Sequence, residues 1–248
     1  MKTQISKISI ILLFVIISGS AYAQDNNDDD KERKGTTHDF GIDLGINNYL
    51  ENGNPPSDSD APYTVKPFGS WYVALKSINN THINGPLHLI WGGDISWYNF
   101  KFENEDIRML KGDDGVFFVE EGDVNSKKSK LTAAYVNASV VPMLAFGDSK
   151  NSKNCHWKLW DKSQGFRIGA GMYAGYKIGS YTKVVTKEGG DKDKDKDHDS
   201  FYLNNFRYGL RVQAGFRGID LFFNYDLNEL FADNKGPKLN AFSIGVVL

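Results

Sequence analysis

The chain has a single cysteine, Cys155, among its 248 residues, and after residue 23 it has no apolar run long enough for a transmembrane helix. One cysteine cannot form an internal disulfide or a cysteine-rich metal site, and the polar neighbours Asn154 and His156 favour a bystander thiol. A helix needs about 20 apolar residues to cross a bilayer. Two classes remain: a soluble exported protein, and a membrane barrel whose short strands alternate in polarity. The mean hydropathy of −0.44 is compatible with either class.

An excess of basic charge is also missing. The chain has 29 Lys and Arg against 31 Asp and Glu, a formal net charge of −2, so no nucleic-acid partner is expected. The histidines are dispersed without the spacing of metal ligands. His198 and Ser200 have a His-x-Ser spacing, but no further motif accompanies them, and the preceding alternation of Asp and Lys from Asp191 to Asp197 is interpreted as part of a solvated loop. We therefore expect a non-enzymatic protein with no catalytic residue, no cofactor and no metal.

The N-terminus has the pattern of an export signal. Lys2 and Lys7 precede an apolar run from Ile8 to Ile17, and Ala21-x-Ala23 follows as a cleavage site. The sequence predicts a signal peptide at 1–23, which directs the chain through the Sec pathway. A disordered acidic leader at 24–36 follows, and a single barrel domain occupies 37–248.

In the segment from Phe206 to Leu227, the register set by a predicted turn can be compared with the polarity of the residues it pairs. If Arg217-Gly218 is a two-residue hairpin turn, Phe216 faces Ile219 and the pairs run outward from there. One face of the hairpin is then wholly apolar or aromatic, and the other collects Gly, Arg, Gln, Asp and Asn. Lipid on one side and a crowded polar lumen on the other would require this division.

Similar alternation recurs in eight segments, at about 40–47, 70–76, 87–98, 134–140, 166–179, 208–216, 219–227 and 241–248. The predicted fold class is all-β, an eight-stranded antiparallel up-and-down transmembrane β-barrel. Short periplasmic turns are expected at 79–86 and 217–218, with a longer one at 147–164. The outer loops are expected at 51–66, 102–130, 180–202 and 231–238. The residues predicted to face lipid are Ile42, Leu44, Trp71, Val73, Ile168, Tyr176, Leu210, Val212, Phe223, Tyr225, Phe242 and Ile244.

The opposite face places charged residues inside the barrel. The lumen of an eight-stranded barrel is just wide enough for side chains to fill it, so buried charges must pair. Arg211 is expected to oppose Asn224 and to reach Asp226 diagonally. We predict a structural network of charges rather than an ion-conducting path, formed by Asp43, Lys76, Asp94, Arg167, Lys177, Arg207, Arg211, Asp220 and Asp226.

Several of these features together resemble a family. The export signal, the eight alternating strands, the Gly-aromatic alternation of 166–179 and the run from Gly209 to Phe231 are similar to small outer-membrane β-barrel proteins of Bacteroidetes, often called PorT-like. They are similar more distantly to eight-stranded barrels of the OmpA and OmpX type. The resemblance covers about Asp39 to Leu248. The chain departs from it at its end, where Leu248 stands in place of an aromatic residue and Phe242 is the nearest ring.

The functional hypothesis is a non-enzymatic integral outer-membrane protein with charged extracellular loops and a structural or surface-interaction role. Its partners would be outer-membrane lipid, the barrel assembly machinery and an extracellular or envelope partner. One alternative is a soluble periplasmic lipocalin-like barrel, with the apolar face lining a cavity for a small ligand. A lipid-modifying enzyme is another, and the family resemblance adds a barrel that supports protein secretion.

Overall fold

The computed structural model describes residues 35–56, 61–122, 126–146, 165–188 and 191–248. The chain divides into two units, Met1–Arg33 and Lys34–Leu248, and only the second is described. The predicted signal peptide, most of the predicted leader and the predicted turn at 147–164, with Cys155, therefore lie outside the described residues. No helix in the described ranges is long and apolar enough to cross a membrane.

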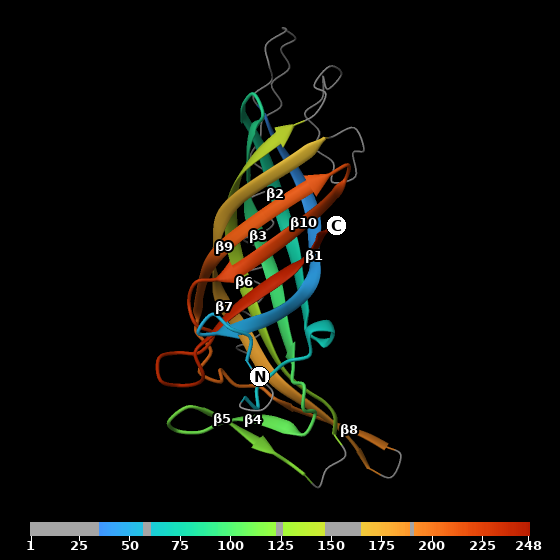
Figure 1. The fold of residues 1–248 in the computed structure, drawn as a ribbon, viewed down its shortest axis with the longest axis vertical. Helices are drawn as coiled ribbons and strands as arrows, with labels where there is room; N and C mark the ends of the chain where they lie inside the picture. Colours follow the sequence, from blue (N-terminus) through green and yellow to red (C-terminus); the bar gives the residue numbers. More distant parts are fainter. Residues whose placement is uncertain (1–34, 57–60, 123–125, 147–164, 189–190) are drawn as a thin grey trace, which may run out of the picture. The chain divides into compact units, whose positions relative to one another are not determined.

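Eight antiparallel strands form a closed ring (Figure 1). Each strand pairs with the next along the chain, β6 pairs with β7, and β1 pairs with β11 to complete the circle. The predicted eight-stranded up-and-down barrel is confirmed, and its closure leaves no free edge in the ring. The strands of the ring are β1 (Thr36–Glu51), β2 (Trp71–Asn84), β3 (Leu87–Lys101), β6 (Ser126–Phe146), β7 (Phe166–Glu188), β9 (Phe206–Phe216), β10 (Ile219–Asp226) and β11 (Leu239–Val247).

Three further strands and a short helix belong to the connections. β4 (Ile107–Lys111) and β5 (Val116–Glu120) form a hairpin between β3 and β6, and β8 (Asp191–Asp197) pairs with the far part of β7. The single-turn helix η1 (Pro67–Gly69) precedes β2. We call the end of the barrel with these additions the loop end, and the end with the turns 85–86 and 217–218 the turn end (Figure 1).

The hairpin of β9 and β10 has the register that the sequence predicts. Phe216 pairs with Ile219, Val212 with Phe223 and Arg211 with Asn224. The φ angles of Arg217 and Gly218 are 48° and 86°, as a two-residue turn needs when its twist must match that of the strands. Along β9 every second residue is buried, so the polarity of the sequence and the inside of the barrel coincide.

Two expectations about connections are wrong. β2 continues to Asn84, and the predicted turn at 79–86 shrinks to Gly85 and Pro86, because the polar Asn79 and Asn80 are buried strand residues. The predicted outer loop 180–202 is largely a hairpin, since β7 runs to Glu188 and pairs with β8. The alternation of Asp and Lys in β8 is therefore that of a strand, in which successive side chains point to opposite faces.

The loop end has a hydrophobic core that closes the mouth of the ring. Aromatic rings from two connections pack together there: the ring centre of Phe118 of β5 lies 5.3 Å from that of Tyr63 and 5.8 Å from that of Phe102. The backbone N–H of Val116 donates to the carbonyl oxygen of Lys235, which ties the β4–β5 hairpin to the connection between β10 and β11. This loop-end core includes Tyr49, Val65, Phe100, Phe102, Ile107, Met109, Phe201, Leu203, Leu230, Phe231 and Leu239.

Candidate functional site: the barrel wall and its lumen

The outer wall of the barrel is an apolar band. All twelve residues predicted to face lipid lie on the outer face, where they alternate with buried neighbours. β7 and β9 define both edges of the band: Phe166 stands beside Phe216 at the turn end, and Tyr176 stands beside Phe206 at the loop end. Between these aromatic pairs the outward residues are Ile168, Ala170, Met172 and Ala174 on β7, and Tyr208, Leu210, Val212 and Ala214 on β9.

The height of this band follows from the strand geometry. Phe166 and Tyr176 are ten residues apart, which is about 34 Å along an antiparallel strand. At a tilt of about 45° this corresponds to a height of about 24 Å, close to the roughly 25 Å apolar belt of membrane barrels. Further aromatic residues extend both edges of the apolar band around the barrel. Phe146 continues the turn-end row, and we define the loop-end aromatic row as Trp71, Trp97, Tyr176, Phe206 and Tyr208.

Inside the ring, Asp43 joins two cations. Arg211 Nη1 donates to Asp43 Oδ2 at 2.8 Å, and Lys76 Nζ lies 3.2 Å from the same oxygen. Arg211 Nη1 also donates to Asn224 Oδ1 at 3.1 Å, so the predicted contact with its neighbour is present. The expected partner Asp226 is wrong, however, because Arg211 extends across the lumen to β1. In so narrow a barrel the opposite wall is as near as the diagonal position on the adjacent strand.

A second group lies nearer the turn end. Arg167 donates to Asp220 Oδ1 at 2.7 Å, and Gln213 Nε2 donates to Asp220 Oδ2 at 3.2 Å. Gln213 Oε1 in turn accepts from Arg211 at 3.4 Å, which links this group to Asp43. Arg167 and Asp220 are 2% and 0% exposed, so each charge depends on the other for compensation.

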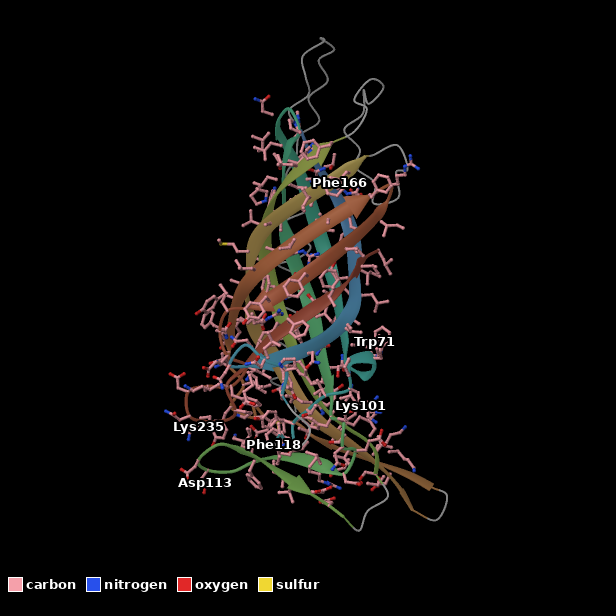
Figure 2. The ribbon with its side chains drawn as sticks, viewed as in Figure 1. Trp71, Lys101, Asp113, Phe118, Phe166 and Lys235 are labelled. Carbon is pink, nitrogen blue, oxygen red and sulfur yellow. The ribbon has the colours of Figure 1, made fainter. Side chains whose placement is uncertain are left out.

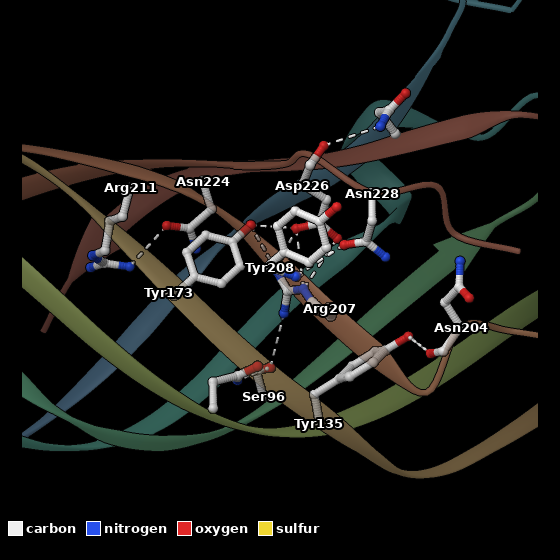
Figure 3. Close-up of polar contacts among 12 residues, drawn as sticks. Ser96, Tyr135, Tyr173, Asn204, Arg207, Tyr208, Arg211, Asn224, Asp226 and Asn228 are labelled. Carbon is white, nitrogen blue, oxygen red and sulfur yellow. Dashed lines mark hydrogen bonds and ion pairs between the residues drawn. The ribbon is translucent and has the colours of Figure 1, made fainter. Parts of the chain in front are cut away.

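A third group surrounds Arg207 (Figure 3). Arg207 Nη2 donates to Asp226 Oδ1 at 2.9 Å, and the Tyr173 hydroxyl donates to the same carboxylate. The guanidinium carbon lies 4.1 Å from the ring centre of Tyr98 and 4.7 Å from that of Tyr173, with Tyr135 at 5.4 Å. The cation is thus held by one carboxylate and three aromatic faces.

Glycines make room for these groups. A Cβ on Gly215 would collide with the side chains of Asp220 and Arg167, and one on Gly209 would collide with the hydroxyl of Tyr173. Asp220, Arg167 and Tyr173 are the cross-strand neighbours of these glycines, so the inward face has glycine where side chains from adjacent strands fold over it.

Asp94 and Lys177 occupy the margins of the predicted network. Asp94 pairs across strands with Lys76 and accepts from Asn137 Nδ2 at 2.6 Å. Lys177 pairs with none of the four carboxylates of the predicted network. Its Nζ donates instead to the carbonyl oxygens of Leu203 and Ser200, at 2.6 and 3.2 Å, toward the loop end. Without Lys177, the predicted network contains four carboxylates and four cations, so its formal charges balance.

Little space remains between these side chains. A cavity of about 20 Å³ lies beside Lys76, Arg211, Gln213 and Asp220, which is about the room of one water molecule. The charge network extends along the lumen from Arg167 to Arg207, and the buried aromatic residues of the loop-end core lie beyond it. This packing favours a plugged lumen over an open one.

The histidine and serine that sequence analysis singled out do not act on one another. The ring of His198 packs 5.3 Å from that of Tyr181, while the Ser200 hydroxyl donates to Asp199 Oδ1 at 3.1 Å. No group of three or more His, Cys, Asp or Glu side chains among the described residues is arranged to hold a metal ion.

Sequence analysis predicted charged loops at this end, but it did not predict the ion pairs between them. Arg108 of β4 pairs with Glu121 at 2.6 Å and with Asp195 of β8 at 3.0 Å. Glu105 accepts from both Lys101 and Lys66, at 2.9 and 3.1 Å. Burial opposes ionisation of Glu105, but the hydrogen bonds from Lys101 and Lys66 outweigh it and lower its pKa. The period-two alternation of residues 191–197 was the available signal for β8, which extends the sheet beyond the ring.

Comparisons with known proteins add little to this geometry. No protein-family model matches the chain, and no curated protein matches it. Among solved structures, the chain is similar to Ail, the attachment invasion locus protein of Yersinia pestis, in a crystal structure with the heparin analogue sucrose octasulfate. The identity is 11%, the alignment covers 87% of this chain and all of that one, and the TM-score is 0.31, too low for any inference about this chain.

Proposed function

We propose that this chain is an integral outer-membrane β-barrel protein with a sealed lumen, which acts as a structural and surface-interaction element rather than as a pore. One observation carries the proposal: a closed ring whose outward residues are apolar over about 24 Å of height, with aromatic rings at both edges. A surface of this kind is expensive in water and is matched to hydrocarbon between two interfaces.

The interior supports the same polarity. A soluble lipocalin-like barrel would need apolar residues around a ligand cavity and polar residues outside. Here Arg167, Arg211 and Asp220 point inward and are almost completely buried, while Phe223 and Ile244 point outward. The balanced network inside also favours a plug over a channel, because every charge of a conducting path would have to exchange its partner as an ion passed.

In this proposal the turn end faces the periplasm and the loop end faces outward. β1 begins and β11 ends on the periplasmic side, as an even number of strands requires. The partners would be outer-membrane lipid, the barrel assembly machinery, and an extracellular or envelope component that contacts the loop end. The Sec signal at 1–23 supplies the export step that this location needs.

Fractionation and gel mobility test the proposal. The protein should remain with the outer membrane after a high-salt wash, and an unboiled sample should migrate differently from a boiled one, because a closed barrel resists detergent until it is heated. The matched control is a soluble periplasmic protein followed in the same lysate. Recovery of the folded chain in the soluble periplasmic fraction would overturn the proposal.

A further inference from the structure

Beyond the loop-end aromatic row, four strands present a row of lysines to the outside. Cross-strand pairing places Lys101 beside Lys130, Lys130 beside Lys183, and Lys183 beside Lys196. The row therefore crosses β3, β6, β7 and β8 without a break, over about 14 Å at the usual spacing of strands. We call these four residues the lysine row.

The lysine row lies on the same face as the apolar band. Trp97, Asn99 and Lys101 alternate along β3, so all three point outward. On the intervening level Asn99 stands beside Thr132, and Thr132 stands beside Tyr181. Lys101 is four residues past Trp97, which is about 14 Å along the strand and about 10 Å in height. Figure 2 shows Trp71 and Lys101 at successive levels on one side of the molecule.

The next set of paired residues beyond the lysine row is also positively charged. Lys128 stands beside Val185, and Val185 stands beside Lys194. The opposite face of β8 carries Asp193, Asp195 and Asp197, and Asp195 pairs with Arg108 of the β4–β5 hairpin. The alternation in β8 thus separates the two signs: carboxylates turn toward the loop-end hairpin, and ammonium groups turn outward.

Few carboxylates compensate the lysine row. Glu105 pairs with Lys101 but is shared with Lys66. The ion pairs found among the described residues include none for Lys128, Lys130, Lys183, Lys194 or Lys196. Because like charges directly opposite one another destabilise a sheet, this arrangement costs stability until an anion binds.

The geometry also orients the ammonium groups. Lys130 Nζ donates to Asn99 Oδ1 at 2.6 Å, and it lies 5.6 Å from the ring centre of Tyr181. Lys196 Nζ lies 5.4 Å from the same ring. Asn99 and Tyr181 lie between the lysine row and the loop-end aromatic row. The side chains of Lys130 and Lys196 therefore lean toward the aromatic row. The adjacent Gly69 of η1 lies against the Lys101 side chain, and Phe68 beside it is 86% exposed, which adds an apolar side chain near this end of the row.

We propose that the lysine row binds the phosphate groups of lipid headgroups in the outer leaflet and so holds phosphorylated glycolipid against this side of the barrel. The inference rests on the proposed membrane location, since it places the row about 10 Å beyond an interfacial tryptophan, at the level of the headgroups. Charge complementarity and continuity with the apolar band favour a lipid over a soluble occupant.

The test uses the full chain in vesicles of phosphatidylcholine, with and without diphosphorylated lipid A. The triple variant Lys130→Gln, Lys183→Gln, Lys196→Gln is compared with the native chain and with a control of equal charge change, Lys127→Gln, Lys235→Gln, Lys238→Gln. Lipid A should raise the temperature at which the native and control barrels lose their folded gel mobility. The triple variant should need about a hundredfold more lipid A for the same rise, since one lysine near an anionic surface contributes about fivefold.

A second readout separates binding from a merely structural role. In phosphatidylcholine alone the triple variant should be at least as heat-resistant as the native chain, because the repulsion within the row is gone. Lower resistance there, or an equal response to lipid A in all three proteins, would overturn the inference. Saturable binding of soluble poly-glutamate with no response to lipid A would assign the row to an acidic protein partner instead. Failure of the native chain to insert into either vesicle would refute the membrane location itself.

Discussion

An arginine placed at mid-height on the outer wall gives the most direct measurement of what that wall faces. Val212 lies four residues from the Phe216 edge and six from the Phe206 edge of β9, so it is close to the middle of the apolar band. Its side chain points outward and is 41% exposed. Four residues correspond to about 14 Å along the strand and about 10 Å of depth, against a half-height of about 12 Å.

In lipid, Val212→Arg should reduce the free energy of unfolding by about 2–4 kcal/mol, the cost of arginine near a bilayer midplane. Ile219→Arg is the matched control: it is also an outward β-branched residue, 63% exposed, but it pairs with Phe216 at the turn-end edge. There the cost should be about 0–1 kcal/mol. Equilibrium unfolding in urea, followed by tryptophan fluorescence in phospholipid vesicles, measures both values. Equal costs at the two positions would refute a hydrocarbon environment for this wall.

Other expected outcomes follow from the lumen and the loop end. Asp43→Asn leaves Arg211 and Lys76 buried without their carboxylate and should cost about 3–5 kcal/mol in the same unfolding assay. The control Glu105→Gln, at the partly exposed loop-end pair, should cost at most about 1 kcal/mol. Similar losses in the two variants would contradict the structural role of the network. In planar bilayers the native barrel should show no stepwise conductance, and open-pore currents in a purified sample would disprove a sealed lumen. The Glu105 carboxyl should titrate by NMR below its ordinary value of 4.5, and Lys101→Gln should move the midpoint upward. Because the pKa of Glu105 is lower in the folded state, the stabilisation from its ion pairs is complete above pH 4.5 and declines as the pH falls through the folded pKa. An unchanged titration midpoint of Glu105 in Lys101→Gln would show that Lys101 does not lower this pKa.

The strands of the ring were predictable because each has one polar face and one apolar face. Alternation decides which face is buried, and a two-residue turn decides the register, so the pairing of Val212 with Phe223 could be derived before any coordinates. The inward direction of Asp43, Arg167 and Asp220 follows from the same alternation.

Contacts across the lumen were not predictable in the same way. Sequence spacing describes neighbours on adjacent strands, and it led to Asp226 as the partner of Arg211, whereas the observed partner Asp43 lies three strands away around the ring. Only the diameter and shear of the closed barrel determine which residues meet there.

The loop-end strands were missed for a different reason. Both β8 and the end of β7 are highly polar, so their period of two was attributed to a solvated loop, although strict alternation of Asp and Lys is also what a strand with two differently charged faces requires. The β4–β5 hairpin has a plainer signal in the sequence, because its apolar runs flank a glycine-rich turn.

The hydrogen-bonded seam between β1 and β11 has a consequence for biogenesis. Asp43 pairs with Val247, so β1 gains its second neighbour only when the far end of the barrel domain has joined the sheet. Until then both strands expose unpaired backbone, and contacts this distant in sequence form slowly. If the chain reaches an outer membrane as proposed, it would need protection from aggregation until the seam closes, and a truncation that removes only β11 would leave every earlier strand intact and the ring open.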